Sequence, residues 1–266
     1  METKKQKVKK SNGVSASIVI FLSAIVAFAF FFGYCGKYPG NYDDLGHPAN
    51  FFGLIYQGGF VVPIILTLLL SVIVLSVERA IALNKAKGKK KLIDFVEAVN
   101  VKLTNEDLAG ARKICDEQGG SVANILTSAL LRYEDIDKNP ISNDAKEELV
   151  RKEIEDATTL ELPALEQNMN VIATISTLGT LLGLLGTVLG MIRSFSAMGQ
   201  EGAPDSTALA VGISEALYNT ASGIGTGALA IISYGYFSNK IQNITNAVDE
   251  IGFTIGQTFT KRSLKK

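Results

Sequence analysis

One carboxylate in an otherwise uncharged stretch is the side chain of this sequence best placed to do chemistry. Glu215 is the only charged residue between Thr207 and Phe237, where glycines, hydroxyls and an amide accompany apolar residues. A segment of this length is typical of a membrane-spanning helix. An ionised carboxylate inside a bilayer costs about 3 kcal/mol or more, so Glu215 must face protein or water, or hold a proton. It is a candidate proton carrier; the alternative is a structural glutamate that is hydrogen-bonded between helices.

Small residues in the preceding apolar stretch indicate a helix that packs closely against another. Four glycines are spaced four, three and four residues apart: Gly179, Gly183, Gly186 and Gly190. They fall on one side of a helix, and small residues in such a row let two backbones approach in lipid. Thr187 lies among them and Thr220 in the next stretch. A threonine in a spanning helix usually bonds to a carbonyl one turn earlier, and this structural role stays open for both residues.

Other chemistries find little support in the sequence. His47 is the sole histidine, which excludes a multi-histidine metal site within one chain, and no G-x-x-x-x-G-K-[ST] phosphate loop is present. We find no paired nucleophile and base, so we expect neither an enzyme nor a bound metal or cofactor. The formal net charge is +0 and basic residues flank apolar runs, so no nucleic-acid partner is required.

Hydropathy predicts the elements that position these residues. The mean hydropathy is +0.23 although 20% of the residues are charged, so apolar and charged blocks are segregated. Uncharged runs extend over Val14 to Phe32, Phe60 to Val77 and Met169 to Ile192, and 207–237 contains one charge. We therefore predict an all-α, polytopic membrane protein with four transmembrane helices, whose long helices extend into a cytoplasmic helical domain.

Basic clusters predict the orientation. Five lysines precede the first run, and a second basic cluster, at residues 85–91, follows the second run. By the positive-inside rule both clusters stay in the cytoplasm, as do the N- and C-termini. The first run resembles a signal peptide, but Phe28 to Phe32 is too bulky for a small-residue cleavage site, so we favour a retained anchor. The only two cysteines, Cys35 and Cys115, are then expected to lie on opposite sides of the membrane. Cys115 is expected to be a small buried residue of a helical hairpin.

The predicted boundaries follow from these runs. They comprise a basic cytoplasmic N-terminus (1–13), an extra N-terminal span (14–32), a periplasmic segment (33–59), a second span (60–78), a cytoplasmic helical domain (79–167), a third span (168–197), a periplasmic turn (198–206), a fourth span with Glu215 (207–237) and a cytoplasmic C-terminal helix (238–266).

Capping patterns predict the helices of the cytoplasmic domain. Turns are expected at Gly119-Gly120 and Asn139-Pro140, and N-caps at Thr104 and Ser142, each followed by acidic residues. From about residue 143 no breaker cluster interrupts the pattern, which predicts one long helix that runs through Pro163 into the third span and is kinked near the membrane surface.

The last two spans also resemble a known family. The stretches Asn170-Val-Ile-Ala-Thr-Ile-Ser-Thr, Gly183-Leu-Leu-Gly-Thr-Val-Leu-Gly-Met-Ile-Arg-Ser-Phe, Gly212-Ile-Ser-Glu-Ala-Leu and Thr220-Ala-Ser-Gly-Ile are similar to the MotA/TolQ/ExbB proton channel family, in its ExbB/TolQ branch. The resemblance covers about residues 165–245. It implies that Glu215, Thr187 and Thr220 form polar rings in a channel. Two features depart from the family: the extra N-terminal span, and the bulky polar pair Tyr218-Asn219.

The resemblance further implies a function and partners. It predicts an ExbB-like channel and stator subunit of an inner-membrane motor that is driven by the proton motive force and energises TonB-dependent outer-membrane transport. The expected assembly is a homopentamer around an ExbD/TolR-like single-span protein, acting on a TonB- or TolA-like protein. A TolQ-like subunit, or another motility or secretion motor subunit of the family, is the alternative. A non-conducting membrane scaffold is the alternative from another class.

Overall fold

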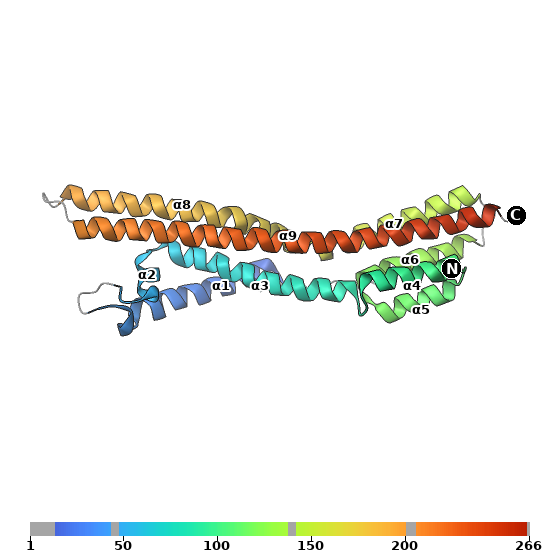
Figure 1. The fold of residues 1–266 in the computed structure, drawn as a ribbon, viewed down its shortest axis with the longest axis horizontal. Helices are drawn as coiled ribbons and strands as arrows, with labels where there is room; N and C mark the ends of the chain where they lie inside the picture. Colours follow the sequence, from blue (N-terminus) through green and yellow to red (C-terminus); the bar gives the residue numbers. More distant parts are fainter. Residues whose placement is uncertain (1–13, 44–47, 138–141, 201–205, 265–266) are drawn as a thin grey trace. The chain divides into compact units, whose positions relative to one another are not determined.

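The chain is helical throughout the part that the structure describes. The computed structural model describes residues 14–43, 48–137, 142–200 and 206–264 (Figure 1). Its helices are α1 (Ala16–Ala29), the π-helix η1 (Phe30–Cys35), the 3₁₀ helix η2 (Pro39–Asn41), α2 (Phe51–Gln57), α3 (Val61–Lys87), α4 (Leu92–Thr104), α5 (Leu108–Gln118), α6 (Gly120–Asp137), α7 (Asn143–Leu165), α8 (Met169–Gln200) and α9 (Ser206–Leu264). Within these ranges no strand is formed, so the all-α prediction is confirmed.

Three helical ranges of the described chain are long and apolar enough to cross a membrane. They are Ala16–Cys35, Val61–Thr104 and Met169–Ser196, and the second runs past the end of α3 into α4. The fourth predicted span, 207–237, is helical as part of α9 but falls outside this group. Glu215 and Asn219 lower its hydropathy, so the count of four spans stays a prediction.

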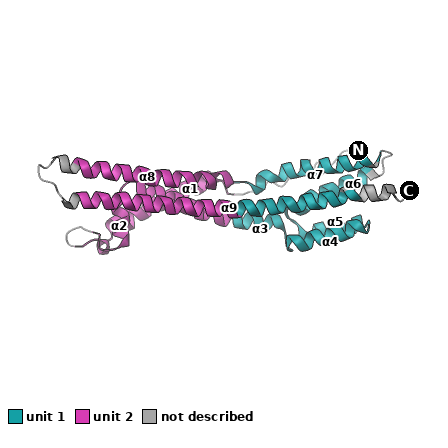
Figure 2. Cartoon of the chain, turned by 45° about the horizontal axis from the view of Figure 1, so that its top comes forward, with its two compact units in different colours: residues 1–13, 79–167, 237–266 teal, residues 14–78, 168–236 magenta. Residues whose placement is uncertain are grey.

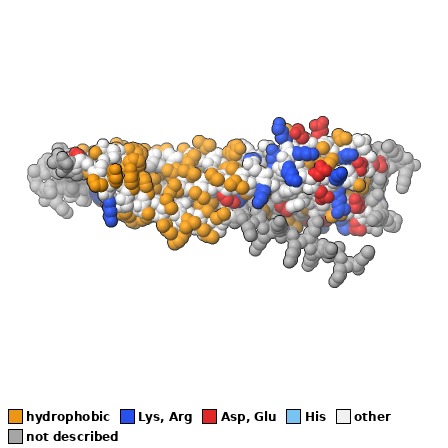
Figure 3. Space-filling model, turned by 90° about the horizontal axis from the view of Figure 1, so that it is seen from below, with side chains coloured by type: hydrophobic (Ala, Val, Ile, Leu, Met, Phe, Trp, Pro, Cys, Tyr) orange, Lys and Arg blue, Asp and Glu red, His pale blue; other side chains and the backbone are white. Residues whose placement is uncertain are grey.

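The helices divide between two compact units (Figure 2). The apolar unit comprises residues 14–78 and 168–236, and the charged unit comprises residues 79–167 and the part of α9 from Phe237 onward. Figure 3 shows one face on which hydrophobic side chains gather in one region and charged side chains in another. Large apolar residues of α1 and α8, such as Phe21 and Leu184, are exposed, as expected for surfaces that meet lipid or other apolar helices.

Helix α1, the predicted extra span, is packed into the apolar unit. Val19 of α1 joins a buried cluster with Val72 and Leu75 of α3 and with Ile172 of α8. Helicity continues through the π-helix η1 to Cys35, beyond the predicted end of this span at residue 32.

Within the predicted periplasmic segment, 33–59, the described residues 33–43 and 48–59 are more ordered than the glycines and prolines suggest. Asn41, which is fully buried, donates from Nδ2 to the backbone oxygens of Tyr34 (2.8 Å) and Cys35 (3.2 Å). The hydroxyl of Tyr42 donates to the same Cys35 oxygen at 2.8 Å. Asn50 caps α2 by accepting from the backbone nitrogens of the second and third residues of that helix. These bonds tie the end of η1 to the segment that leads into α2. His47 lies outside the described residues.

The prediction of one long helix from α7 into the third span is wrong. Helix α7 ends at Leu165, and α8 begins at Met169 after Asn168, whose φ is 64°. Pro163 lies in the last turn of α7, where it supplies no backbone N–H. The side chain of Arg79 then caps this end, since its Nη1 donates to the backbone oxygens of Ala164 and Leu165, each at 3.3 Å. A buried arginine therefore stabilises a helix end that the sequence pattern did not reveal.

The capping predictions in the charged unit have mixed outcomes. Ser142 accepts from the backbone nitrogen of Ala145 and caps α7, as predicted. Thr104 is not an N-cap: it is the last residue of α4, and Asp107 caps α5 by accepting from Gly110 N at 2.8 Å. Three residues separate α4 from α5, so the N-cap of α5 is Asp107 and not Thr104, the first side chain in the sequence that could have capped it.

The glycine turn and the buried cysteine of this unit are as predicted. Gly119 and Gly120 have φ of 63° and 87°; Gly119 lies between α5 and α6, and Gly120 is the first residue of α6. Cys115 of α5 is buried and forms no disulfide. The Asn139-Pro140 turn lies outside the described residues.

Candidate functional site

The candidate site lies between α8 and the first half of α9, whose backbones approach closely (Figure 1). The glycine row of α8 faces α9 along its length. A methyl group added at Gly183 would lie 3.0 Å from the backbone oxygen of Asn219, and one at Gly190 would lie 3.1 Å from Ala216 Cβ. From the other side, a methyl group at Gly223 would lie 2.6 Å from backbone atoms of Gly179 and Gly183. Larger residues at these positions would push the helices apart.

This close approach brings the two predicted threonines together. The Oγ1 atoms of Thr187 and Thr220 contact each other across the helix pair. Thr187 Oγ1 also lies 3.1 Å from the backbone oxygen of Gly183, one turn earlier, and 3.2 Å from that of Ala216 on α9. Each hydroxyl has a single proton, so only one of these acceptors is used at a time. The pair therefore holds two exchangeable protons at one point of the interface, in addition to the backbone bond typical of a spanning threonine.

Glu215 pairs with an arginine that the sequence did not single out. Its Oε1 lies 2.8 Å from Nη1 of Arg193, near the end of α8. The side chain of Glu215 is 12% exposed and that of Arg193 is 58% exposed. Arg193 is the only charged residue of α8, and Glu215 is the only charged residue of α9 before Lys240. Opposite charges on neighbouring apolar helices are expected to pair, and these two isolated charges were the signal in the sequence that could have identified the pair.

A glycine turn before α3 closes over the same carboxylate. Gly59 has a φ of 73°, a conformation that favours glycine, and a side chain there would overlap Glu215 Oε1 and approach Arg193 Nη1. Asn219, one helical turn after Glu215, is fully buried and donates from Nδ2 to the backbone oxygen of Gly58 at 2.9 Å. Its Oδ1 is buried and has no hydrogen-bond partner among the described residues.

Tyr218 and Asn219, the bulky polar pair noted in the sequence, both contact segments that precede α3. Tyr218 packs on a buried cluster that includes Phe31 and Cys35 of η1 and Ile55 of α2. Asn219 bonds to the Gly58 turn, as described above. The bulky pair on α9 thus contacts η1, α2 and the turn that follows α2.

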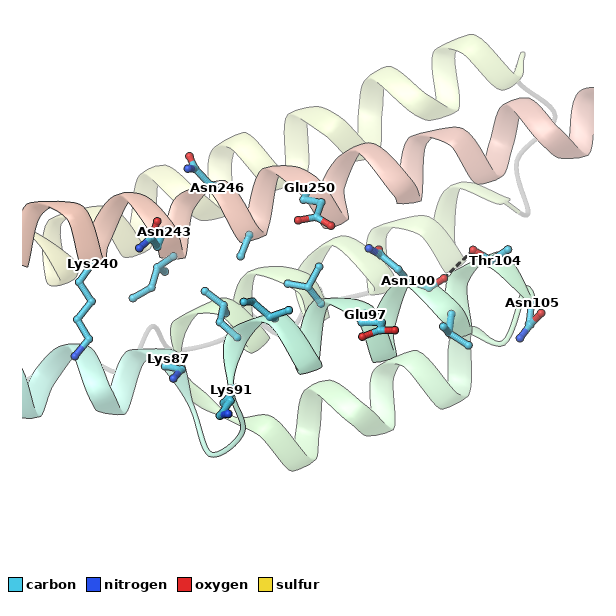
Figure 4. Close-up of a pocket in the computed structure, with 16 residues that line it drawn as sticks. Lys87, Lys91, Glu97, Asn100, Thr104, Asn105, Lys240, Asn243, Asn246 and Glu250 are labelled. Carbon is cyan, nitrogen blue, oxygen red and sulfur yellow. Dashed lines mark hydrogen bonds between the residues drawn. The ribbon is translucent and has the colours of Figure 1, made fainter.

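A groove in the charged unit contains none of the predicted site residues. It has a volume of about 960 Å³ and lies between α4 and the later part of α9 (Figure 4). Lys87, Lys91 and Lys240 gather toward one end, and Glu97 and Glu250 lie farther along it (Figure 4). Within the described ranges no group of three histidine, cysteine or acidic side chains could hold a metal ion.

Comparison with known proteins gives a consistent family. Residues 121–250 match the MotA/TolQ/ExbB proton channel family. A protein of Synechocystis sp. named putative biopolymer transport protein ExbB-like 3 is 46% identical over 76 residues, which are 28% of this chain and 36% of that protein. The biopolymer transport protein ExbB of Xanthomonas campestris is 27% identical over 119 residues, 45% of this chain and 47% of that protein.

A longer match is to a protein named TolQ. The Tol-Pal system protein TolQ of Haemophilus influenzae is 26% identical over 216 residues, which cover 76% of this chain and 91% of that protein. The chain thus spans about half or less of the two ExbB-named relatives and most of this TolQ. From the family match and from these relatives, the chain is a member of the MotA/TolQ/ExbB proton channel family, in its ExbB/TolQ branch.

Proposed function

We propose that this protein is the channel and stator subunit of an inner-membrane motor that is driven by the proton motive force and energises TonB-dependent outer-membrane transport. The observation that carries the proposal is the polar site on an apolar helix pair: Glu215 on α9, with Thr187 and Thr220 in contact across the interface. Glu215 would take up and release the proton, and the two hydroxyls would continue the path. The subunits would form a homopentamer around an ExbD/TolR-like single-span helix, and a TonB- or TolA-like protein would receive the work.

The placement in the membrane belongs to the same proposal. We infer a multi-pass protein of a bacterial inner membrane with four spans and with both termini in the cytoplasm. The continuous helix of α9 over 207–237 supports the fourth span, and the basic residues at 85–91 support the orientation. The charged unit then lies in the cytoplasm, and α2 on the opposite side.

The energetics are compatible with proton-driven movement. One proton crossing about 100 mV releases roughly 2.3 kcal/mol. A hydrogen bond to a charged group contributes about 1.5–3 kcal/mol to stability. The passage of one proton is thus comparable in energy with breaking and re-forming one bond such as that between Arg193 and Glu215.

Substitution of Glu215 tests the proposed proton pathway directly. The complex would be purified from the host membrane through a tag on this chain and reconstituted in liposomes that contain a pH-sensitive dye. We expect Glu215→Gln to lower the proton flux at least about tenfold, because the amide cannot take up and release a proton in this pH range. Glu250→Gln, on the exposed part of the same helix, is the matched control and should leave the flux unchanged. Unaltered flux with an intact Glu215→Gln complex would refute this role of Glu215, and an absence of flux from the unmodified complex would support the non-conducting scaffold instead.

A TolQ-like role is the second candidate, and the extent of the match to a TolQ supports it. The two roles predict different phenotypes for the Glu215→Gln host strain. Loss of energy-dependent uptake across the outer membrane with a normal envelope would support the TonB-linked role. Defective envelope constriction with normal uptake would support the TolQ-like role.

A further inference from the structure

Three separate segments restrain the carboxylate of Glu215, and each does so in a different way. Arg193 of α8 holds Oε1 in an ion pair at 2.8 Å. The Gly59 turn lies so close to the same oxygen that a side chain there would overlap it. Asn219 of α9 holds that turn in place through its bond to Gly58. A carboxylate that only needed burial would require none of this convergence.

The charges of the two helices also single out this pair. Helix α8 contains one charged residue, and α9 contains one before Lys240, and these two residues meet. Glu215 is mostly covered, whereas Arg193 is more than half exposed, so the arginine has room to move and the carboxylate does not. The Arg193–Glu215 ion pair can therefore break and re-form through movement of the arginine side chain alone.

We propose that Arg193 and the Gly58–Gly59 turn form a latch that holds Glu215 as a carboxylate and that opens each time the residue accepts a proton. This inference rests on the proposed function, since it concerns how the same site is loaded. Arg193 acts as a positioning residue: it does not carry the proton.

The proton step has a simple balance. A donor, either a hydronium ion or a carboxylic acid of the partner helix, transfers its proton to an Oε atom of Glu215. The donor becomes water or a carboxylate, and Glu215 becomes neutral. The bond to Arg193 Nη1 weakens because its acceptor is no longer charged, and the guanidinium moves away from the carboxyl group with its charge unchanged. Release of the proton from Glu215 restores the pair.

Chemical labelling of Glu215 tests the latch directly. A hydrophobic carbodiimide adds to a protonated carboxyl group, and mass spectrometry of the peptide that contains residue 215 measures the adduct. With the complete complex in its membrane, we expect Arg193→Gln to raise the labelling rate about three- to tenfold, since a charge-assisted hydrogen bond to the carboxylate is lost. Arg193→Lys keeps a cation and should stay within about twofold of the unmodified protein, although lysine lacks the planar guanidinium.

Two further variants separate the latch from a general loss of structure. Gly59→Ala keeps the guanidinium of Arg193 in the chain but crowds both members of the ion pair and displaces the carboxylate, so it should raise labelling in the same way. Lys37→Gln removes an exposed cation from another segment of the apolar unit and should have no effect. Equal labelling of Glu215 in the unmodified protein, in Arg193→Gln and in Gly59→Ala would overturn the latch.

The labelling assay is independent of proton flux, so the two proposals can fail separately. If Glu215→Gln conducts normally while Arg193→Gln still raises labelling, the channel role of Glu215 is wrong and the restraint on its carboxylate stands. If Glu215→Gln abolishes conduction and labelling is the same in every variant, the channel role stands and the latch is wrong.

Discussion

Substitution of Gly223 by alanine tests the close approach of α8 and α9. The added methyl group would lie 2.6 Å from the backbone oxygen of Gly179 and from Gly183 Cα, about 0.8 Å short of the 3.4 Å at which ordinary contact begins. Both obstacles are backbone atoms, so no side chain can rotate away. The two helices must therefore separate at the level of the site.

The expected magnitude combines two opposing effects. Alanine in place of glycine within a helix gains roughly 0.5–1 kcal/mol because the unfolded chain loses freedom. Overpacking of a tight interface costs about 1–3 kcal/mol, and the threonine contact across it contributes about 0.6 kcal/mol in membrane proteins. We expect Gly223→Ala to be about 1–2 kcal/mol less stable than the unmodified protein.

Glycines on the same helix supply the controls. Gly225 and Gly235 have no atom within 4 Å of an added methyl group, so alanine there should stabilise the helix by about 0.5–1 kcal/mol. The assay is unfolding of the full chain in mixed micelles of mild detergent and dodecyl sulfate, followed by circular dichroism. If Gly223→Ala unfolds at the same dodecyl sulfate fraction as Gly225→Ala, the close backbone approach described here is wrong.

Two predictions concern the charged unit. Arg79→Met keeps the apolar stem but removes both bonds to the end of α7, so we expect a loss of about 1.5–3 kcal/mol and faster hydrogen exchange in the last turn of α7; unchanged exchange would contradict the capping role. Burial, aided by the charge of Asp116, raises the pKa of Cys115 from 9.0 to about 12. The folded chain therefore keeps this proton at pH values where the unfolded chain has lost it, so the contribution of Cys115 to stability is complete below pH 9 and disappears as the pH rises toward 12. The unmodified protein should lose more stability over that range than Cys115→Ala, and iodoacetamide should modify Cys115 at pH 8.5 only after unfolding; rapid modification of the folded chain would refute this.

Local patterns predicted much of the helical architecture. The glycine row indicated a close contact, and the structure places α9 against it, with Thr187 beside Thr220. The Gly119-Gly120 turn, the Ser142 cap and the buried Cys115 could be predicted because each depends on residues within a turn or two of sequence. Such features are set by backbone conformation and periodicity, which a single sequence contains.

Contacts between distant segments could not be predicted in the same way. The pairing of Arg193 with Glu215 and the bond from Asn219 to Gly58 join residues 22 and 161 positions apart. The end of α7 was missed for the same reason, since its cap is Arg79, more than 80 residues earlier in the chain. Proline alone did not locate that end, because the chain continues helically past Pro163 to Leu165.

The segment from η1 to α2 folds without any covalent cross-link. Its one cysteine, Cys35, is buried with a free thiol, and the order of the segment comes from the main-chain bonds of Asn41, Tyr42 and Asn50 and from stacked and edge-on rings such as those of Phe31 and Tyr56. Reducing agents should therefore leave this region intact. The protein can be prepared with a thiol reductant throughout, which keeps both cysteines available as spectroscopic labelling points after controlled unfolding.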